Sequence, residues 1–596
     1  MLRMQHRLCD TGLVKRASGS MHIDDTSRHY VTAGGERRIT RCLLLRRSYR
    51  DDNGKPRNET LANLSALPDN AIAALRLALK GATLVDAESV FDVERSVPHG
   101  NVAAAHLMAG KLGLRSLLGP PCPQRDIAYA LIVSRAVRPK SKLSTVRWWN
   151  AGDTTLAADL GVADAATDDV YQAMDWLLAQ KGAIEKKLAR RHLRPGGIAM
   201  YDLSSSWVEG TCCELAAFGY SRDGKRGRAQ IEYGLLTDPD GRPVGIDLFK
   251  GNTADAIAFT TAVDKVRTDF GLNELVFVGD RGMITKTRIQ DLRKLEGAGW
   301  VTALKAPDIA ALAADGGPLQ LSLFDEQNLA EITHPDYPGE RLVACRNPAL
   351  AESRRLKRES LLAATEADLE KIRSSVSAGR LKDKDKIGVR VGKVIGKHKV
   401  GKHFTWDISD GEFTFSRDEE KIAAEARLDG IYVIRTTMTA DAADASGVVR
   451  TYKNLKYVER DFKTIKIDDL DIRPIRHYLP GRVEAHLLIC MLAAYLTWHL
   501  RQAFAPLTFT DENIPQPSDP VIPARRSLRA AVKDAVKETP DGLTLYRYRD
   551  LLEHLATLDR QIINFSGQQI EKITTPTAVQ ARVFDLLGSP VPVRLT

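Results

Sequence analysis

The sequence lacks the features that mark several large classes of protein. Its 596 residues hold seven cysteines, an odd number with no Cys-x2-Cys spacing, and only Cys212 and Cys213 are close together. No disulfide framework or cysteine zinc site is therefore indicated, which is typical of a reducing compartment. The longest apolar run, around Leu487–Trp498, is too short to span a bilayer. The basic N-terminus has no apolar signal region. We expect a soluble cytoplasmic protein with no membrane partner.

Internal repeats and low-complexity tracts are also missing, so a solenoid or a largely disordered chain is not expected. Hydrophobic residues make up 43% of the sequence and charged residues 27%, which is typical of a globular protein with several structural units. Lys and Arg (86) exceed Asp and Glu (76), giving a net charge of +10 and a pI near 9.1. This excess is a moderate bias towards polyanions such as nucleic acid.

The first part of the chain predicts a basic arm, a hairpin and a helical region. Residues 1–36 are polar, basic and without periodicity, and we expect them to be disordered. Residues 37–64 read as two strands joined by an Asp-Asn-Gly turn. Helical patterns follow up to residue 195, and we interpret residues 37–195 as the DNA-binding region. Arg125–Arg138 and Ser141–Trp149 could form a helix-turn-helix or, equally, two core helices of a small bundle.

From residue 196 the pattern changes to short strands alternating with helices. Three hairpin-type strands precede two strand–helix–strand units, which predicts an α/β fold with a mixed sheet and flanking helices, as in a ribonuclease-H-like core. We assign this core to residues 196–305 and 429–504. Residues 306–428 break the pattern and read as a largely β insertion with one long charged helix. Residues 505–596 form a Pro-rich linker and a C-terminal segment.

Three carboxylates occupy positions where a metal site can form. Asp202 lies inside an apolar strand, where an unpaired carboxylate would be costly unless it were paired, protonated or bound to a cation. Asp280 stands at the end of the fourth predicted strand of the core, at the edge where open sheets place their sites. Glu459 borders the apolar face of a predicted helix spanning Val448–Lys466. Oxygen ligands suit Mg²⁺ or Mn²⁺, and two such ions about 4 Å apart would clamp a phosphodiester.

The motifs around these carboxylates resemble those of one family, the DDE transposases of bacterial insertion sequences. The matching stretches are YDLSSS around Asp202, GDRGM around Asp280, and Tyr452-x2-Leu455-x3-Glu459-x6-Lys466. The last is similar to the signature Tyr-x2-Arg-x3-Glu-x6-Lys of a large group that also carries a β-rich insertion before the Glu. FGYSRDGKRG, GNTAD and QLSLFDE add to the resemblance, which extends over most of residues 37–504.

The resemblance implies a function and a set of site residues. Asp202, Asp280 and Glu459 would be the catalytic, metal-binding triad, and Tyr452, Lys466 and Arg281 would contact DNA. The protein would bind the terminal inverted repeats of its element, cleave there and join the 3′-OH ends to target double-stranded DNA. It would act as a homodimer or larger assembly in the bacterial nucleoid. The signature Arg is Leu455 here, and its role would pass to Arg460, Lys453 or Lys456, or be absent.

A basic stretch inside the predicted insertion suggests a second DNA contact. Residues 380–402 hold nine Lys and Arg side chains with glycines between them, and we interpret them as a β segment lining a DNA groove. Its predicted DNA-binding residues are Arg390, Lys393, Lys397 and Lys399. The alternative is a solvated run of charge.

Two other functions stay open at this point. One is a catalytically silent DNA-binding protein descended from a transposase, which the presence of all three carboxylates argues against. The other is a glycosidase that uses a carboxylate pair. The basic insertion argues against a glycosidase, and dependence on divalent metal would distinguish the two chemistries.

Overall fold

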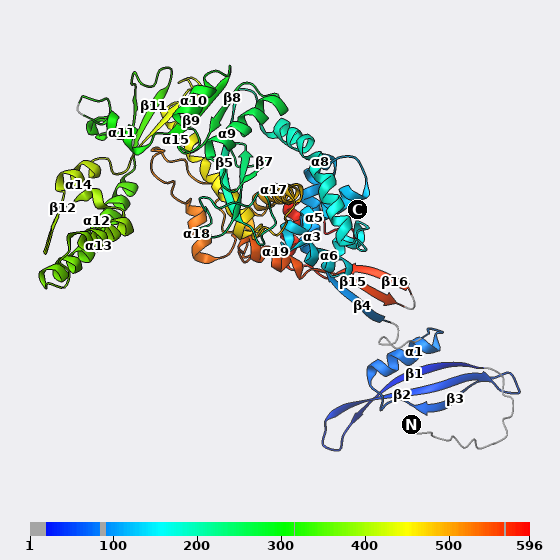
Figure 1. Ribbon diagram of the computed structural model, residues 1–596. Coiled ribbons are helices and arrows are strands. Elements are labelled where there is room, and N and C mark those ends of the chain that lie inside the picture. Colours follow the sequence, from blue (N-terminus) through cyan, green and yellow to red (C-terminus); the bar gives the residue numbers. More distant parts are fainter. Residues whose placement is uncertain (1–18, 84–90, 315, 566–567, 596) are drawn as a thin grey trace. The chain divides into compact units, whose positions relative to one another are not determined.

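The computed structural model describes residues 19–83, 91–314, 316–565 and 568–595, and the chain divides into two compact units (Figure 1). One unit comprises residues 1–95 and 562–570, and the other comprises residues 96–561 and 571–596.

The smaller unit is a three-stranded antiparallel sheet with one helix. Its sheet order is β1-β2-β3, and its elements are β1 (Ser20–Val31), β2 (Arg37–Arg50), β3 (Pro56–Asn63) and α1 (Asp69–Leu79). Its small core consists of Leu43, Leu64 and Ile72. The predicted hairpin is confirmed, because β2 pairs with β3 around a turn in which Asp51 Oδ1 accepts from the backbone N–H of Asn53 and Lys55.

The prediction that residues 1–36 are disordered is wrong for residues 20–31. These residues form β1 and pair with β2 along the whole length of the strand. The polar composition of β1 fits a strand that is largely solvent-exposed on an edge of the sheet, where periodicity is weak. Residues 1–18 lie outside the described residues.

A helical layer precedes the main sheet in the larger unit. Its helices are α3 (Gly100–Lys111), α4 (Leu114–Leu118), α5 (Pro123–Val137), α6 (Lys142–Asn150), α7 (Thr155–Asp159) and α8 (Thr167–His192). Strand β4 (Phe91–Pro98) precedes them, and its residues up to Arg95 belong to the smaller unit. Every residue of α5 from Ile127 to Val137 is buried, and Trp149 of α6 is fully buried. This burial supports the two-core-helix interpretation of α5 and α6 over the helix-turn-helix.

The main sheet has eight strands in the order β10-β11-β14-β9-β8-β5-β6-β7. They are β5 (Gly197–Trp207), β6 (Gln230–Thr237), β7 (Pro243–Lys250), β8 (Leu275–Val278), β9 (Ala298–Ala303), β10 (Leu329–Ile332), β11 (Arg341–Arg346) and β14 (Ile431–Thr436). β5 is parallel to β8, and β8 is parallel to β9, whereas every other pairing in the sheet is antiparallel. The mixed α/β sheet predicted from the sequence is therefore present.

Helices pack on this sheet and connect its strands. They are α9 (Asp255–Asp264), the π-helix η1 (Lys265–Asp269), α10 (Lys286–Leu292), α15 (Ala445–Lys453), α16 (Leu455–Lys463), the π-helix η4 (Thr464–Asp468) and α17 (Pro480–Ala503). Within the described residues, α17 alone is long and apolar enough to cross a membrane, and 83% of its apolar window is buried inside the protein. It packs against α5, α8 and β7, which is the environment of a core helix.

The predicted insertion, residues 306–428, differs from expectation in two ways. Its first part belongs to the main sheet, because β10 and β11 extend that sheet beyond β14. The remainder is mainly helical rather than β. Its elements are α11 (Ala306–Leu312), η2 (Leu321–Phe324), α12 (Pro348–Ser377), α13 (Lys384–His398), η3 (Gly401–His403), β12 (Phe404–Ser409), β13 (Glu412–Arg417) and α14 (Glu419–Ala426). The segment from α12 to β13 has a hydrophobic core of its own, whereas α11 and η2 pack in a core with β11 and β14.

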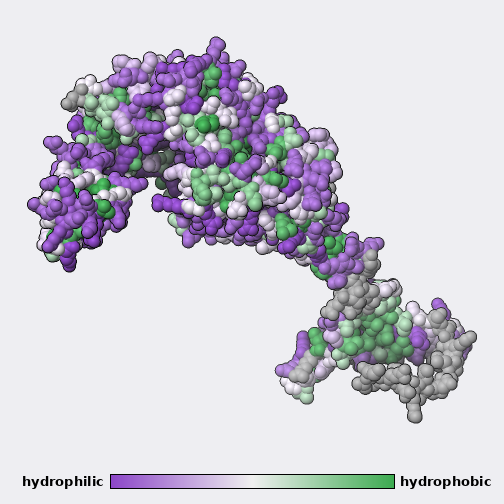
Figure 2. Space-filling model, viewed as in Figure 1, coloured by the Kyte–Doolittle hydropathy of each residue, from purple (hydrophilic) through white to green (hydrophobic). Residues whose placement is uncertain are grey.

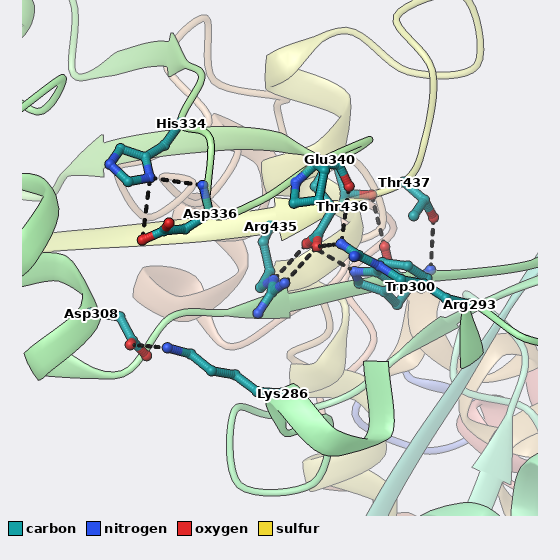
Figure 3. A network of polar contacts seen from close by, with 11 residues as sticks. Lys286, Arg293, Trp300, Asp308, His334, Asp336, Glu340, Arg435, Thr436 and Thr437 are labelled. Carbon is teal, nitrogen blue, oxygen red and sulfur yellow. Dashed lines mark hydrogen bonds and ion pairs between the residues drawn. The ribbon is translucent and has the colours of Figure 1, made fainter. Parts of the chain in front are cut away.

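A buried ion-pair network fastens the loop before β11 to the sheet (Figure 3). The Glu340 carboxylate accepts from both ends of the Arg435 guanidinium at 2.6 and 2.5 Å, from Arg293 at 2.6 Å and from the Trp300 indole at 3.2 Å. The Glu340 side chain has no exposed surface. Since buried charges are tolerated only when paired in this way, the network fixes β14, β9 and this loop together.

The C-terminal segment is folded and belongs to the larger unit except at residues 562–570. It contains η5 (Ala505–Leu507), α18 (Leu528–Val536), α19 (Tyr548–Ala556), β15 (Asp559–Phe565), β16 (Gln568–Ile573) and α20 (Ala578–Leu586). Helices α19 and α20 contact α3, and β15 lies between β16 and β4 in a three-stranded sheet. The Pro-rich linker also packs, with Val521 fully buried.

Candidate active site

Asp202 and Asp280 lie beside each other because of the register between β5 and β8. The last paired residues of these parallel strands are Met200 and Val278. Each aspartate follows two residues later in its own chain, and residues two apart point to the same face of a sheet. Adjacent strands are about 4.8 Å apart, so the two carboxylates are neighbours on one face at the end of β8.

The electrostatics of Asp202 show that Glu459 also lies close by. Burial, together with the negative charges of Asp280 and Glu459, raises the pKa of Asp202 to about 7, although the Leu203 N–H and Arg222 act in the opposite direction. One oxygen of Asp202 accepts from the backbone N–H of Leu203 at 2.8 Å. The three predicted carboxylates therefore interact, and burial together with their mutual repulsion disfavours the charged form of Asp202.

The turn that follows β8 holds Asp280 in place. Its Oδ1 accepts from the backbone N–H groups of Gly282 and Met283 at 2.9 and 2.8 Å. A Cβ atom on Gly282 would stand 3.3 Å from that same oxygen, so glycine suits this position. The second oxygen of Asp280 forms no hydrogen bond with the described residues and is available to a ligand.

Glu459 is presented by α16, which packs on β5. The apolar face predicted from the sequence is confirmed, because Val458, Phe462 and Ile465 are all buried. The Glu459 side chain is exposed, and it forms no hydrogen bond or ion pair with the described residues. The predicted single helix is interrupted at Asn454 and ends in the π-helix η4, so Tyr452 is on α15 and Lys466 is on η4.

Tyr452 and Arg281 lie at the same cluster. Burial raises the pKa of the Tyr452 hydroxyl to about 12, and the charges of Asp280, Glu459 and Asp202 add to the effect, while Arg281 opposes it. The hydroxyl is therefore a hydrogen-bond donor at neutral pH. Arg281 is exposed and forms no ion pair within the described residues, so its guanidinium can reach an incoming anion.

Lys466, the third predicted DNA contact of the core, is arranged differently. Its ammonium forms a 2.8 Å ion pair with Asp223, which also pairs with Arg473 at 2.7 Å. The Lys466 residue is 7% exposed. A direct phosphate contact by Lys466 would require this ion pair to break, and the arrangement instead gives Lys466 a role in anchoring η4.

A second layer of charged residues surrounds Asp202, and sequence reasoning did not select it. Arg222 pairs with Asp255 at 2.5 Å and with Glu232 at 3.2 Å. Burial raises the pKa of Glu232 to about 7, with Arg222 opposing the shift. The signal was present in FGYSRDGKRG and GNTAD, which contain Arg222 and Asp255. Two exposed aromatic residues, Phe218 and Tyr220, precede Arg222 in that stretch.

The proposed substitutes for the signature Arg at Leu455 are not equivalent. The Lys453 ammonium donates to the backbone carbonyl of Val521 at 2.6 Å and is committed to the linker. Arg460 and Lys456 both lie over the ring of Tyr457. Arg222 is a cation whose charge acts directly on Asp202.

The carboxylate oxygens of Asp202, Asp280 and Glu459 suit a hard divalent cation. Carboxylate oxygens are the preferred ligands of Mg²⁺ and Mn²⁺. On both Asp202 and Asp280, only Oδ1 accepts a hydrogen bond from the residues that the structure describes. Among the described residues, no three His, Cys, Asp or Glu side chains stand in positions that already enclose an ion. The backbone thus brings the right ligands together, and their side chains have to converge on the cation.

The basic stretch predicted as a β groove is the helix α13. Lys386, Arg390, Lys393 and Lys397 recur at helical spacing and are exposed, which places them on one face, hereafter the α13 stripe. Lys397 pairs with Asp368 of α12 at 2.9 Å. Lys399 follows at the helix end with a left-handed backbone (φ 57°). Figure 2 shows a largely hydrophilic surface over this part of the molecule.

Comparison with protein families identifies the class. Residues 206–496 match the family described as "Transposase DDE domain", a span that contains Asp280 and Glu459 and begins just after Asp202. Residues 32–89 match "IS1634 family transposase, N-terminal domain". The chain therefore belongs to the DDE transposases of bacterial insertion sequences. DDE transposase domains use divalent metal ions, which agrees with the donor set described above.

Comparisons with curated proteins and with solved structures do not identify the fold or function further. No curated protein matches the chain. Among solved structures, a cryo-EM structure of the piggyBac transposase synaptic complex with hairpin DNA aligns with 67% of this chain and 72% of its own, at 8% identity and a TM-score of 0.34. A TM-score this low does not establish a shared fold.

Proposed function

We propose that this enzyme binds the terminal inverted repeats of its own insertion sequence, cleaves phosphodiester bonds at those ends and joins the 3′-OH ends to target DNA. The observation that supports the proposal is that Asp280 and Glu459 lie close enough to Asp202 for their charges to act on its carboxylate. Asp202 is on β5, Asp280 is two residues beyond the parallel strand β8, and Glu459 is on α16, which packs against β5.

The strand order supports a ribonuclease-H-like core. Within the sheet, β7-β6-β5 are successively antiparallel, and β8 and β9 follow on the other side of β5 in parallel. In this proposal the core comprises residues 196–305 and 429–504, extended by β10 and β11. The mainly helical segment from α12 to α14 is the inserted part.

The three carboxylates would hold Mg²⁺ or Mn²⁺. Such ions, when bound, activate the attacking oxygen and stabilise the leaving oxygen of the phosphodiester. The residues of the chain orient the reaction. The turn at Gly282 and Met283 fixes Asp280, Arg222 offsets the charge on Asp202, and Tyr452 donates a hydrogen bond to a phosphate oxygen. Arg281 contacts the backbone of the DNA near the cleaved bond.

DNA further from the chemistry would follow basic and aromatic surfaces. The α13 stripe and Lys399 present exposed cations that suit sequence-independent phosphate contacts. Phe218 is 73% and Tyr220 81% exposed, and such rings stack on bases. Residues 37–195 would recognise the ends. The working unit would be a homodimer on DNA, in the cytoplasm and associated with the nucleoid.

Cleavage of linear DNA that carries the element's own ends tests this proposal. Purified protein is incubated with the DNA in Mg²⁺, Mn²⁺ or EDTA, and wild type is compared with Asp202→Asn, Asp280→Asn and Glu459→Gln. Asp264→Asn, on the exposed end of α9, is the matched control. We expect metal-dependent nicking at the ends that all three site variants lose while DNA binding is retained, and that the control keeps.

Two outcomes would change the conclusion. A site variant that cleaves like wild type would show that its carboxylate is wrongly assigned. Wild-type protein that binds the ends specifically but never cuts them in either metal would point to a catalytically silent, transposase-derived DNA-binding protein.

A further inference from the structure

A basic cavity lies outside the carboxylate cluster. It has a volume of about 430 Å³ and is formed by the turn between α5 and α6, the loop after η4 and the first half of α17. Its walls contain the cations Arg135, Lys140, Lys142, Arg473 and Arg476, with a single carboxylate, Asp471. Cavities of this size commonly hold small ligands.

Two of these cations are buried without a counter-charge. Arg135 and Lys142 are each 6% exposed. Arg135 donates to the backbone carbonyl of Leu470 at 3.2 Å, and the Lys142 ammonium shares a 3.1 Å hydrogen bond with His486 Nδ1. Neither forms an ion pair with any Asp or Glu side chain that the structure describes. An unpaired buried charge costs several kcal/mol, so the positive charge in the cavity wall lacks the counter-charge that would offset this cost.

Loss of the proton from Lys142 does not remove the excess of positive charge in the cavity wall. Burial and the neighbouring Arg135 lower the pKa of Lys142 to about 7, so the amine can lose its proton near neutral pH. Arg135 cannot, because a guanidinium stays charged throughout the physiological range. His486 is kept neutral, since burial and the charges of Lys142 and Arg135 lower its pKa well below the ordinary value. A net positive charge therefore persists in the wall.

Further groups in the wall suit an anion. The nine-residue helix α6 begins here, and its capping residue Ser141 and first residues Lys142 and Leu143 line the cavity. The N-terminal end of a helix carries partial positive charge. Lys140 and Arg476 are exposed and can reach a ligand from the solvent side.

We propose that this cavity binds a phosphate group, held by Arg135 and Lys142 in the wall and by Arg476 at the mouth. The source we favour is a backbone phosphate of the bound DNA, and that choice rests on the function proposed above. Arg473 supports a DNA phosphate as the source. This residue lines the cavity and also pairs with Asp223. Asp223 in turn pairs with Lys466, which follows the Glu459 helix, so the cavity is linked to the carboxylate cluster.

Calorimetric titration of the full-length protein with inorganic phosphate tests the site. EDTA is present throughout, so that no metal at the carboxylates can recruit phosphate. Lys142→Met removes a buried cation, and Arg476→Ala removes an exposed one that the fold does not depend on. Arg582→Ala, exposed on α20, is the charge-matched control. We expect wild type and the control to bind phosphate and both cavity variants to lose about tenfold or more in affinity.

The outcomes separate the parts of the proposal. Absence of phosphate binding by wild type, or unchanged binding by Arg476→Ala and Lys142→Met, would overturn the site. A repeat titration with protein saturated by duplex DNA identifies the source: loss of phosphate binding supports a DNA phosphate, and retention overturns that assignment in favour of free phosphate. None of these readouts depends on cleavage, so failure of the proposed catalytic function would be seen independently.

Discussion

Lys466 and Asp223 form a 2.8 Å ion pair in which the aspartate is almost completely buried. Asp223 also forms an ion pair with Arg473, so a single carboxylate binds two cations from the segment that follows the Glu459 helix. This pair ties the glycine-rich FGYSRDGKRG stretch to η4. The position of Glu459 therefore depends on a residue far away in the sequence.

Replacing Asp223 with Asn should destabilise the protein strongly. The change leaves Lys466 and Arg473 buried without a counter-charge, which costs about 3 kcal/mol or more. Chemical denaturation followed by circular dichroism measures the loss. Asp240→Asn, which breaks an exposed pair with Arg242, is the control and should cost less than about 1 kcal/mol. Equal effects of the two variants would contradict the role of Asp223.

The stability of the metal-free enzyme should depend on the ionisation of Asp202. The pKa of Asp202 is raised to about 7, above its value in the unfolded chain. The contribution of Asp202 to the free energy of unfolding is therefore fully present below about pH 4 and is lost as the pH rises through 7. Asp202→Asn removes this dependence. The variant should gain stability relative to wild type between pH 5 and pH 8, on the order of 2 kcal/mol, given about 1.4 kcal/mol per pKa unit and some solvent contact.

Thermal unfolding of both proteins across this pH range, with EDTA, measures the difference. Added Mg²⁺ should stabilise wild type and leave Asp202→Asn less affected, because the ion interacts with the charged carboxylate. A constant difference between the two proteins at all pH values would refute the raised pKa.

Substituting the α13 stripe should weaken DNA binding without changing cleavage chemistry. Arg390→Ala combined with Lys393→Ala removes two exposed cations that have no ion-pair partner among the described residues. The slope of log affinity against log salt concentration should fall by about 2, since each phosphate contact contributes about one. Lys371→Ala, on α12 and paired with Asp368, is the control and should leave the slope unchanged.

Gly282→Ala should impair the active site through Asp280. The added methyl group would lie 3.3 Å from Asp280 Oδ1, so the carboxylate has to move by a few tenths of an ångström. Misplaced catalytic groups are costly, and we expect cleavage to fall about tenfold with DNA binding retained. Gly388→Ala, where nothing lies within 4 Å of the new atom, should cleave like wild type.

The sequence predicts the main sheet well because its strands have strong local signals. Apolar runs bounded by glycine-containing turns predict strands at residues 230–237 and 243–250, which are the bounds of β6 and β7. The strand predicted at residues 197–203 continues to Trp207 in β5. The convergence of Asp202 with Asp280 followed from placing one within a strand and the other at a strand end. The register that makes them neighbours is a property of the assembled sheet.

The sequence misleads where tertiary packing overrides local propensity. Residues 388–395 contain Val, Ile and Gly in an arrangement that favours a strand. In the fold, Asp383 caps a helix by accepting from the Lys386 N–H, and Ile387 and Val391 pack one turn apart in a core shared with α12. The second layer of Arg222, Asp255 and Glu232 was missed for a related reason, since those residues meet only after β6 and α9 are in place.

The paired ends of β11 and β14 have a consequence for how this enzyme can change. Arg346 and Ile431 are opposite each other in the sheet, and the Asn347 N–H donates to the Gly430 carbonyl at 2.9 Å. Everything from α12 to α14 thus leaves and re-enters the sheet at one point, as the tip of a hairpin would. A segment attached in this way is exchangeable: it could be shortened to a tight turn, or replaced by a different fold, while the strands below it keep their pairing. The sheet that carries the three carboxylates can in this way acquire a new domain through a single insertion site.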